Sequence, residues 1–272
     1  MLSANNLTFR VGSRALVDGA TASFEPGRLH LIVGANGAGK STLIKLLTRL
    51  MRPHEGTVEY DGADIGGWSE RQLARRRAVL SQAVEVAFSM PVRELVMMGR
   101  YPHFGARPGA SDLHICEEVM RYFEVDAMAD RSYGTLSGGE KQRVQFARVL
   151  AQIWRPMEGL VRYLFLDEPL TFLDIRHQID FMNKVRSFSL QPDVVAVGVL
   201  HDLSLAARFS DRLLLLHQGR ILADGSPAEV LREEHLRTAF QVSPVLLTNP
   251  ATGERHVVFE PAGSRVVDRT DR

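Results

Sequence analysis

Residues 34–41 read GANGAGKS, which satisfies the pattern G-x-x-x-x-G-K-[ST]. The stretch follows the apolar run 29–33 and precedes the helix-like segment 42–50, the strand-to-helix context that this pattern requires. Its glycines let backbone N–H groups close around phosphate oxygens, and the next helix adds its positive end. Lys40 then reaches the β- and γ-phosphates, and Ser41 ligates Mg²⁺. The alternative is a glycine-rich turn with a chance lysine, but the context favours a site for ATP or GTP.

The composition is that of an ordinary globular protein, with 272 residues of which 45% are hydrophobic. A formal net charge of +1 argues against broad electrostatic attraction to DNA or to anionic lipid. Cys116 is the single cysteine, so no internal disulfide forms and a reducing, cytoplasmic setting is expected. No apolar run approaches the roughly 18 to 20 residues that span a bilayer, and the start, MLSANNLTFR, lacks signal-peptide regions. We therefore expect a soluble protein whose membrane role would come through a protein partner.

Two kinds of apolar pattern predict two kinds of strand. Leu7, Phe9 and Val11 alternate with polar residues, as do parts of 56–60, which favours half-buried antiparallel strands near the N-terminus. Other runs are almost continuously apolar and suit strands of a parallel sheet covered on both faces, namely 29–33, 79–80, 163–166 and 194–200. The sequence therefore predicts an α/β fold with a mostly parallel sheet.

Each of these apolar runs ends in a polar residue of a particular kind. The phosphate loop follows the first run, and the later runs are followed by Gln82, by Asp167 and Glu168, and by His201. In open α/β sheets ligands sit beyond the carboxyl ends of the strands, so all four ends are expected to face one bound nucleotide. Taken singly, Gln82 and His201 would be ordinary surface or capping residues, and the argument rests on their convergence.

The remaining segments predict a helical insertion and a C-terminal part. Residues 83–134 have apolar residues at helical spacing, which we interpret as an inserted helical lobe. A hairpin is expected around Gln218 and Gly219, followed by a helix over 227–236. Residues 256–259 are expected to form a last strand, and the polar tail after Pro261 is expected to be loose.

Residues 137–140 read SGGE, which obeys the capping box S-x-x-E ahead of a helix-like stretch that starts at Lys141. Two glycines in a first helical turn cost roughly 1 kcal/mol each against alanine if they behave as interior positions. That cost indicates that something approaches the backbone closely, and bare N–H groups beside a serine hydroxyl favour phosphate. Structural capping and phosphate binding are compatible, so both interpretations stay open.

Together these residues resemble the ATP-binding cassette (ABC) ATPases over nearly the whole chain. LSGGEKQR at 136–143 looks like the family signature, and YLFLDEP at 163–169 is similar to its Walker B segment. Gln82 matches the family's Q-loop, residues 173–174 its D-loop and His201 its switch histidine, in the family's order and spacing.

The resemblance implies a P-loop NTPase fold with a RecA-like core, an N-terminal antiparallel β subdomain and an inserted α-helical subdomain. The ABC ATPase domain would take residues 1–241, with the core at about 1–82 and 135–241 and the helical subdomain at about 83–134. Residues 242–272 would form a C-terminal extension.

In this family the signature serves the opposite subunit, so the resemblance implies two chains facing head to tail around two ATP molecules. The implied ATP contacts in one chain are Gly34, Ala35, Asn36, Gly37, Ala38, Gly39, Lys40, Ser41, Thr42 and Val11. The implied contacts to the opposite subunit's ATP are Ser137, Gly138, Gly139 and Glu140. Mg²⁺ would be organised by Ser41, Gln82 and Asp167, and Asp174 would contact the partner.

The residues implied for hydrolysis are Glu168, His201, Lys40 and Gln82. Glu168 follows the metal-associated Asp167 at a strand end and is expected to polarise the attacking water. A free glutamate has a pKa of about 4.3 and is a weak base, so either its neighbours tune it or its role is positional. His201 is expected to sense the γ-phosphate. Because phosphoryl transfer depends mostly on positioning and charge stabilisation, no covalent nucleophile is required.

Two positions depart from the family's pattern. An aromatic residue usually stands just before a glycine in the N-terminal strand and stacks on adenine, whereas Val11 precedes Gly12 here. Phe9 lies two residues back on the same strand face and is one alternative for stacking, and weak stacking on the base is the other, so whether Val11 or Phe9 contacts adenine stays open. Phe172 stands in the D-loop where a small residue is common.

Several stretches resemble the importers for iron chelates, haem and cobalamin. These are VRELVMMGRYPH at 92–103 and LDIRHQ at 173–178, and the extra segment 155–162 favours haemin within that group. The resemblance implies a homodimer that drives a separate membrane permease dimer from the cytoplasmic face of the bacterial inner membrane. A periplasmic haemin-binding protein would act on it only through the permease. Ferric siderophore and cobalamin are alternative cargoes, and a non-transport ABC ATPase and a P-loop kinase are alternatives of other classes.

Two further sets of residues suggest a nucleic-acid site and a haem-ligating site, and we adopt neither interpretation. Arg75, Arg76 and Arg77 suggest nucleic acid, but a short basic run on a helix is usually a solvated face and the net charge is near neutral. His103 and His114 suggest haem ligation, but their spacing makes no defined metal site. We expect all five side chains to lie at the surface.

Overall fold

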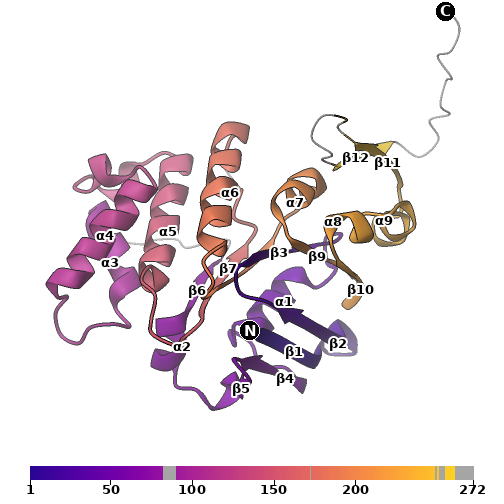
Figure 1. Cartoon of the computed structure of the whole chain (residues 1–272), viewed down its shortest axis with the longest axis horizontal. Helices are drawn as coiled ribbons and strands as arrows, with labels where there is room; N and C mark the ends of the chain where they lie inside the picture. Colours follow the sequence, from indigo (N-terminus) through magenta and orange to yellow (C-terminus); the bar gives the residue numbers. More distant parts are fainter. Residues whose placement is uncertain (82–89, 172, 249, 251–254, 261–272) are drawn as a thin grey trace, which may run out of the picture.

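The computed structural model describes residues 1–81, 90–171, 173–248, 250 and 255–260 (Figure 1). Gln82, Phe172 and the tail that was expected to be loose lie outside the described residues.

An antiparallel sheet forms the N-terminal part of the fold, with strand order β2-β1-β4-β5. Its strands are β1 (Leu2–Val11), β2 (Arg14–Phe24), β4 (Glu55–Tyr60) and β5 (Ala63–Asp64). Strands β1 and β2 are joined by a two-residue turn, in which Gly12 supplies the positive φ of 58° that a tight hairpin needs. Val11 and Arg14 are the pair that closes this hairpin. The antiparallel pairing predicted for this region is confirmed.

A six-stranded sheet lies beside it, with strand order β10-β9-β3-β8-β7-β6. Its strands are β3 (Arg28–Val33), β6 (Arg77–Leu80), β7 (Arg162–Asp167), β8 (Val194–Val199), β9 (Arg212–His217) and β10 (Arg220–Gly225). Apart from β10, which pairs antiparallel with β9, the strands run parallel. Leu29 and Leu31 pack into one core and Ile32 into the other, so apolar residues cover both faces. The buried parallel sheet predicted from continuous apolar runs is therefore confirmed.

The helices are α1 (Lys40–Leu47), α2 (Glu70–Arg76), α3 (Val92–Met97), α4 (Ala110–Tyr122), α5 (Gly138–Ile153), α6 (Ile175–Ser189), α7 (Leu203–Phe209), α8 (Pro227–Val230) and α9 (Glu233–Phe240). Helices α3, α4 and α5 gather at one end of the molecule, beyond β6 (Figure 1). The single helix predicted over 227–236 is wrong, because Leu231 leaves the helical conformation with φ −84° and ψ 61°. This break allows Leu231 and Leu236 both to be buried.

A two-stranded hairpin ends the described chain, formed by β11 (Ser243–Thr248) and β12 (Arg255–Glu260). The strand expected at 256–259 is present, and its partner β11 was not predicted. The Val257 N–H donates to the Ser204 hydroxyl at 3.2 Å, and the rings of Phe240 and Phe259 lie 5.4 Å apart. The hairpin is therefore attached to α7 and α9.

The basic run at the end of α2 is mostly buried, so the expectation of a solvated face is wrong. Arg76 and Arg77 are each only 9% exposed, whereas Arg75 is exposed. Arg76 pairs with Asp61, and Arg77 donates to the carbonyl oxygen of Thr48. The physical reason is that α2 ends at Arg76 and the chain turns directly into β6 of the central sheet.

His103 is half-buried rather than a surface residue, and its Nε2 lies 2.7 Å from the carbonyl oxygen of Gln152. Burial, aided by the charge of Arg100, lowers the pKa of His103. His114 is exposed and faces Glu118 at 3.1 Å. Among the described residues, no three His, Cys, Asp or Glu side chains gather in a way that could hold a metal ion. None of the described helices is long and apolar enough to cross a bilayer.

His30 is a fully buried titratable group in β3. Its Nε2 lies 3.0 Å from both the main-chain nitrogen and the main-chain oxygen of Glu25, and its Nδ1 has no partner among the described atoms. Burial is the largest influence and lowers the pKa of His30 below 6.5, against the hydrogen bond to Glu25.

We expect acid to destabilise the protein through His30. A lowered native pKa means that the unfolded chain binds the proton more readily, so this contribution to stability is lost as pH falls below about 6.5. The slope is at most about 1.4 kcal/mol per pH unit for one such group. Urea unfolding of the wild type and of His30→Gln, at about pH 7.5 and 5.5, measures it. A pH dependence that is equally steep in both proteins would contradict this role.

Candidate functional site

The phosphate loop lies between β3 and α1 and needs glycine at two of its positions. Gly34 and Gly39 have φ values of 151° and 105°, which side-chain-bearing residues rarely adopt. A Cβ on Gly34 would lie 2.3 Å from the carbonyl oxygen of Leu216, and one on Gly39 would lie 2.2 Å from that of Leu16. The loop is therefore pressed against β9 and β2, and its backbone N–H groups are kept at the start of α1.

Lys40 is the first residue of α1 and is only 5% exposed. Its ammonium donates to the carbonyl oxygens of Gly34 and Ala35 at 2.8 and 3.0 Å. Burial lowers the pKa of Lys40, and the charges of Glu168 and Asp167 act in the opposite direction. The loop thus holds a cation inside its own curve, where phosphate oxygens can replace the carbonyl groups as its partners.

Ser41 and Asp167 come together at the end of β7. The Ser41 hydroxyl donates to Asp167 Oδ1 at 2.9 Å. Asp167 is 6% exposed, and burial raises the pKa of its carboxyl, helped by the Glu168 charge and opposed by the bond from Ser41. A hydroxyl and a carboxylate oxygen side by side are hard oxygen ligands of the kind that Mg²⁺ prefers. The pair therefore fits Mg²⁺.

Glu168 and His201 form a close pair at the same edge of the sheet. Glu168 Oε1 lies 2.6 Å from His201 Nε2. Glu168 has a φ of 52°, a left-handed conformation that is uncommon and strained for a non-glycine residue. It lines a cavity of about 290 Å³ together with Lys40 and Ser41, and a second cavity of about 230 Å³ together with His201. Glu168 thus connects the phosphate loop to His201.

The signature residues cap α5 as predicted. The Ser137 hydroxyl accepts the Glu140 N–H at 3.3 Å, and the Glu140 carboxylate accepts the Ser137 N–H at 2.7 Å. The hydrogen bond from the Ser137 N–H, together with one from the Ser137 side chain to the carboxylate, lowers the pKa of Glu140. None of the residues 137–140 lines either cavity that borders the phosphate loop of the same chain. Ser137 and Gly138 are exposed instead, and are open to another molecule.

Asp174 caps the neighbouring helix α6. Its carboxylate accepts the main-chain N–H of His177 at 2.9 Å and lies 2.8 Å from the imidazole Nδ1. Both bonds lower the pKa of Asp174, whose side chain is nevertheless well exposed. Gln142 of α5 donates to the carbonyl oxygen of Pro169 at 2.8 Å, which ties the signature helix to the segment after β7.

The structure therefore brings together five of the residues predicted from sequence, namely Lys40, Ser41, Asp167, Glu168 and His201. Gln82 lies outside the described residues. Val11 and Phe9 line neither cavity beside the phosphate loop. Sequence reasoning missed Arg14 and Leu16 of β2, which do line the phosphate cavity. The sequence signal that could have identified Arg14 is the tight turn at Gly12, which places residue 14 opposite Val11.

Comparison with known proteins gives consistent matches. A family model described as ABC transporter matches residues 17–171. The chain is 42% identical over 249 residues to the hemin import ATP-binding protein HmuV of Bordetella avium (strain 197N), covering 92% of this chain and 95% of that protein. It is 43% identical over 267 residues to the hemin import ATP-binding protein HmuV of Gloeobacter violaceus, covering 98% and 96%. Its fold is similar to a solved metal-chelate type ABC transporter in an inward-facing conformation, with a TM-score of 0.79 and 23% identity over 96% of each chain. The predicted fold class is confirmed.

Proposed function

Since this chain belongs to the ABC transporter family, we propose that it is the ATP-hydrolysing subunit of an importer that takes up haemin through a separate membrane permease. One observation carries the choice of haemin, namely 42–43% identity over more than nine tenths of the chain to two hemin import ATP-binding proteins. Ferric siderophore and cobalamin are the cargoes against which it has to be tested.

The site geometry supports ATP hydrolysis by this chain's own residues. Lys40 and the backbone N–H groups of the phosphate loop bind the phosphates, and Glu168 is placed at the same cavity to orient water and accept its proton. His201 holds the Glu168 carboxylate through their 2.6 Å contact. Mg²⁺ held by Ser41 and Asp167 would neutralise phosphate charge, and Gln82 is proposed as a further ligand.

The assembly that we propose is a head-to-tail homodimer. Exposed Ser137 and Gly138 lie outside the phosphate cavities of their own chain, so a second copy is needed to bring them to a nucleotide. Exposed Asp174 is proposed to contact the partner copy. The helical subdomain at about 83–134, inserted into a core at about 1–82 and 135–241, would meet the permease dimer on the cytoplasmic face of the inner membrane. Residues 242–272 would be an extension, and a periplasmic haemin-binding protein would signal through the permease.

Reconstitution tests this proposal. The chain is assembled with its permease in lipid vesicles, and ATP hydrolysis is measured with the binding protein free or loaded with haemin, ferric siderophore or cobalamin. We expect haemin alone to stimulate hydrolysis, because the relatives named above are hemin import ATP-binding proteins. The same assembly carrying Glu168→Gln is the control for hydrolysis by contaminants. Stimulation by siderophore and not by haemin would overturn the choice of cargo and leave the ATPase assignment standing.

A further inference from the structure

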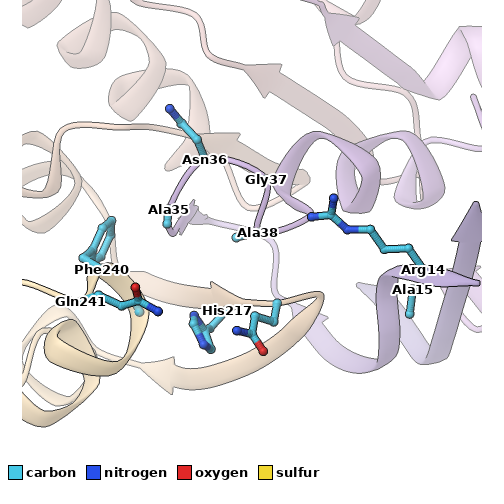
Figure 2. Close-up of a pocket in the computed structure, with 11 residues that line it drawn as sticks. Arg14, Ala15, Ala35, Asn36, Gly37, Ala38, His217, Phe240 and Gln241 are labelled. Atoms are coloured by element: carbon cyan, nitrogen blue, oxygen red, sulfur yellow. The ribbon is translucent and has the colours of Figure 1, made fainter.

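The phosphate cavity continues past the phosphate loop toward the hairpin of β1 and β2. Arg14 and Leu16 form its wall on that side, facing the loop at Asn36 and Gly37. A larger cavity of about 540 Å³ adjoins it and shares Arg14, Asn36 and Gly37 (Figure 2). With the phosphates of a nucleotide bound in the loop, its base and sugar would extend along this wall into the larger cavity.

The β1 strand offers no aromatic ring for the base at this wall. Val11 is 60% exposed but carries only an isopropyl group. The Phe9 ring is stacked on His54 with the ring centroids 4.8 Å apart, and it packs against the core beneath the antiparallel sheet. Moving Phe9 onto a base would break this packing. A side chain that stacks on the base would therefore come from another strand.

Arg14 has the position and the freedom to do so. It is the cross-strand partner of Val11, so the two side chains share one face of the hairpin. Its guanidinium Nη2 lies 3.8 Å from the point where a Cβ on Gly37 would be, and Figure 2 shows the side chain extending from β2 to the loop. Arg14 has no hydrogen bond or ion pair with any residue that the structure describes. Arg10 on the neighbouring strand, in contrast, faces Asp18 at 3.9 Å.

We propose that Arg14 holds the nucleoside half of ATP by stacking its guanidinium plane on the base. The inference rests on the proposed ATPase function and specifies how its substrate is bound. A guanidinium is planar and weakly hydrated and attracts the π-face of a ring, whereas an ammonium group lacks the plane. Because every base has a π-face, this contact adds affinity without choosing between adenine and guanine.

The test is a set of affinities measured by calorimetry without transport. ATP, GTP and inorganic tripolyphosphate are titrated into the wild type, Arg14→Ala, Arg14→Lys and the matched control Arg10→Ala. We expect Arg14→Ala to weaken ATP and GTP alike by roughly 5- to 10-fold and to leave tripolyphosphate unchanged. Arg14→Lys should fall between Arg14→Ala and the wild type, because the ammonium keeps a cation–π attraction to the ring and loses the stacking plane. Arg10→Ala should match the wild type.

A rescue variant separates stacking from other causes. Val11→Tyr in the Arg14→Ala background places an aromatic ring on the same face and should recover the lost ATP affinity. An equal loss of tripolyphosphate affinity in Arg14→Ala would overturn base stacking and make Arg14 a phosphate contact. Unchanged ATP affinity in Arg14→Ala, with a wild type that binds ATP, would also overturn it. A wild type that binds no nucleotide would instead contradict the ATPase function itself.

Discussion

Replacing Glu168 by glutamine is expected to lower ATP turnover by at least about 100-fold while ATP binding is retained. The amide has nearly the same shape as the carboxylate and can still contact His201, which lies 2.6 Å away in the native protein. It cannot accept a proton from water, so the chemical step stops and the ATP-bound state accumulates. Phosphate release and the dissociation constant for ATP, measured on the same preparation, separate the two effects.

Two further measurements make this test specific. Size-exclusion chromatography with ATP should show Glu168→Gln as a stable dimer, because the nucleotide that we propose to join the two copies is not consumed. The matched control is Glu234→Gln, which removes a well-exposed carboxylate on α9 and should leave turnover unchanged. Near-normal turnover of Glu168→Gln would remove Glu168 from this role and leave a positional or structural one.

The site could be predicted from the sequence because parallel strands carry it. Their buried runs are visible as continuous apolar stretches, and their carboxyl ends meet at one edge. The sequence therefore predicts Asp167, Glu168 and His201 beside the phosphate loop, where they lie. The antiparallel pairing of the first strand was likewise visible as alternation. These predictions succeed because each depends on local pattern and on one general rule of sheet geometry.

Other features depend on tertiary contacts that no local pattern reports. Arg76 and Arg77 are basic and adjacent, yet both are buried. Arg76 pairs with Asp61, and Arg77 donates to the carbonyl oxygen of Thr48 at the end of α1. The helix predicted over 227–236 is interrupted at Leu231, because a straight helix would not bury both Leu231 and Leu236. Arg14 was missed because its importance depends on the turn at Gly12 and on the nearness of the phosphate loop.

The second large effect on ATP turnover tests which of the two chains supplies the signature residues 137–140 to each nucleotide. Lys40→Ala and Ser137→Asp are each expected to lower turnover by at least about 100-fold, because each damages the electrostatic contact to phosphate. Aspartate is as good a helix cap as serine, so Ser137→Asp keeps the start of α5 and adds a negative charge that repels the γ-phosphate. The two variants therefore fail for different reasons while the fold is kept.

Mixing these two inactive variants should restore activity if each nucleotide lies between two chains. In a mixed dimer, Lys40 from the Ser137→Asp chain meets Ser137 from the Lys40→Ala chain, which makes one intact site, while the other site carries both defects. Random association makes half of the dimers mixed, so about a quarter of wild-type activity is expected if the sites act independently. Co-expression followed by phosphate-release assays measures the recovery.

A control mixture shows whether recovered activity comes from a signature supplied by the partner chain. Mixing Lys40→Ala with the double variant Lys40→Ala/Ser137→Asp gives no dimer with an intact site, so this control mixture should stay inactive. If a site instead used Ser137 of its own chain, both chains of the first mixture would remain defective and no activity would return. Recovery in the first mixture alone therefore requires a signature supplied by the partner, which agrees with the absence of residues 137–140 from the phosphate cavities of their own chain.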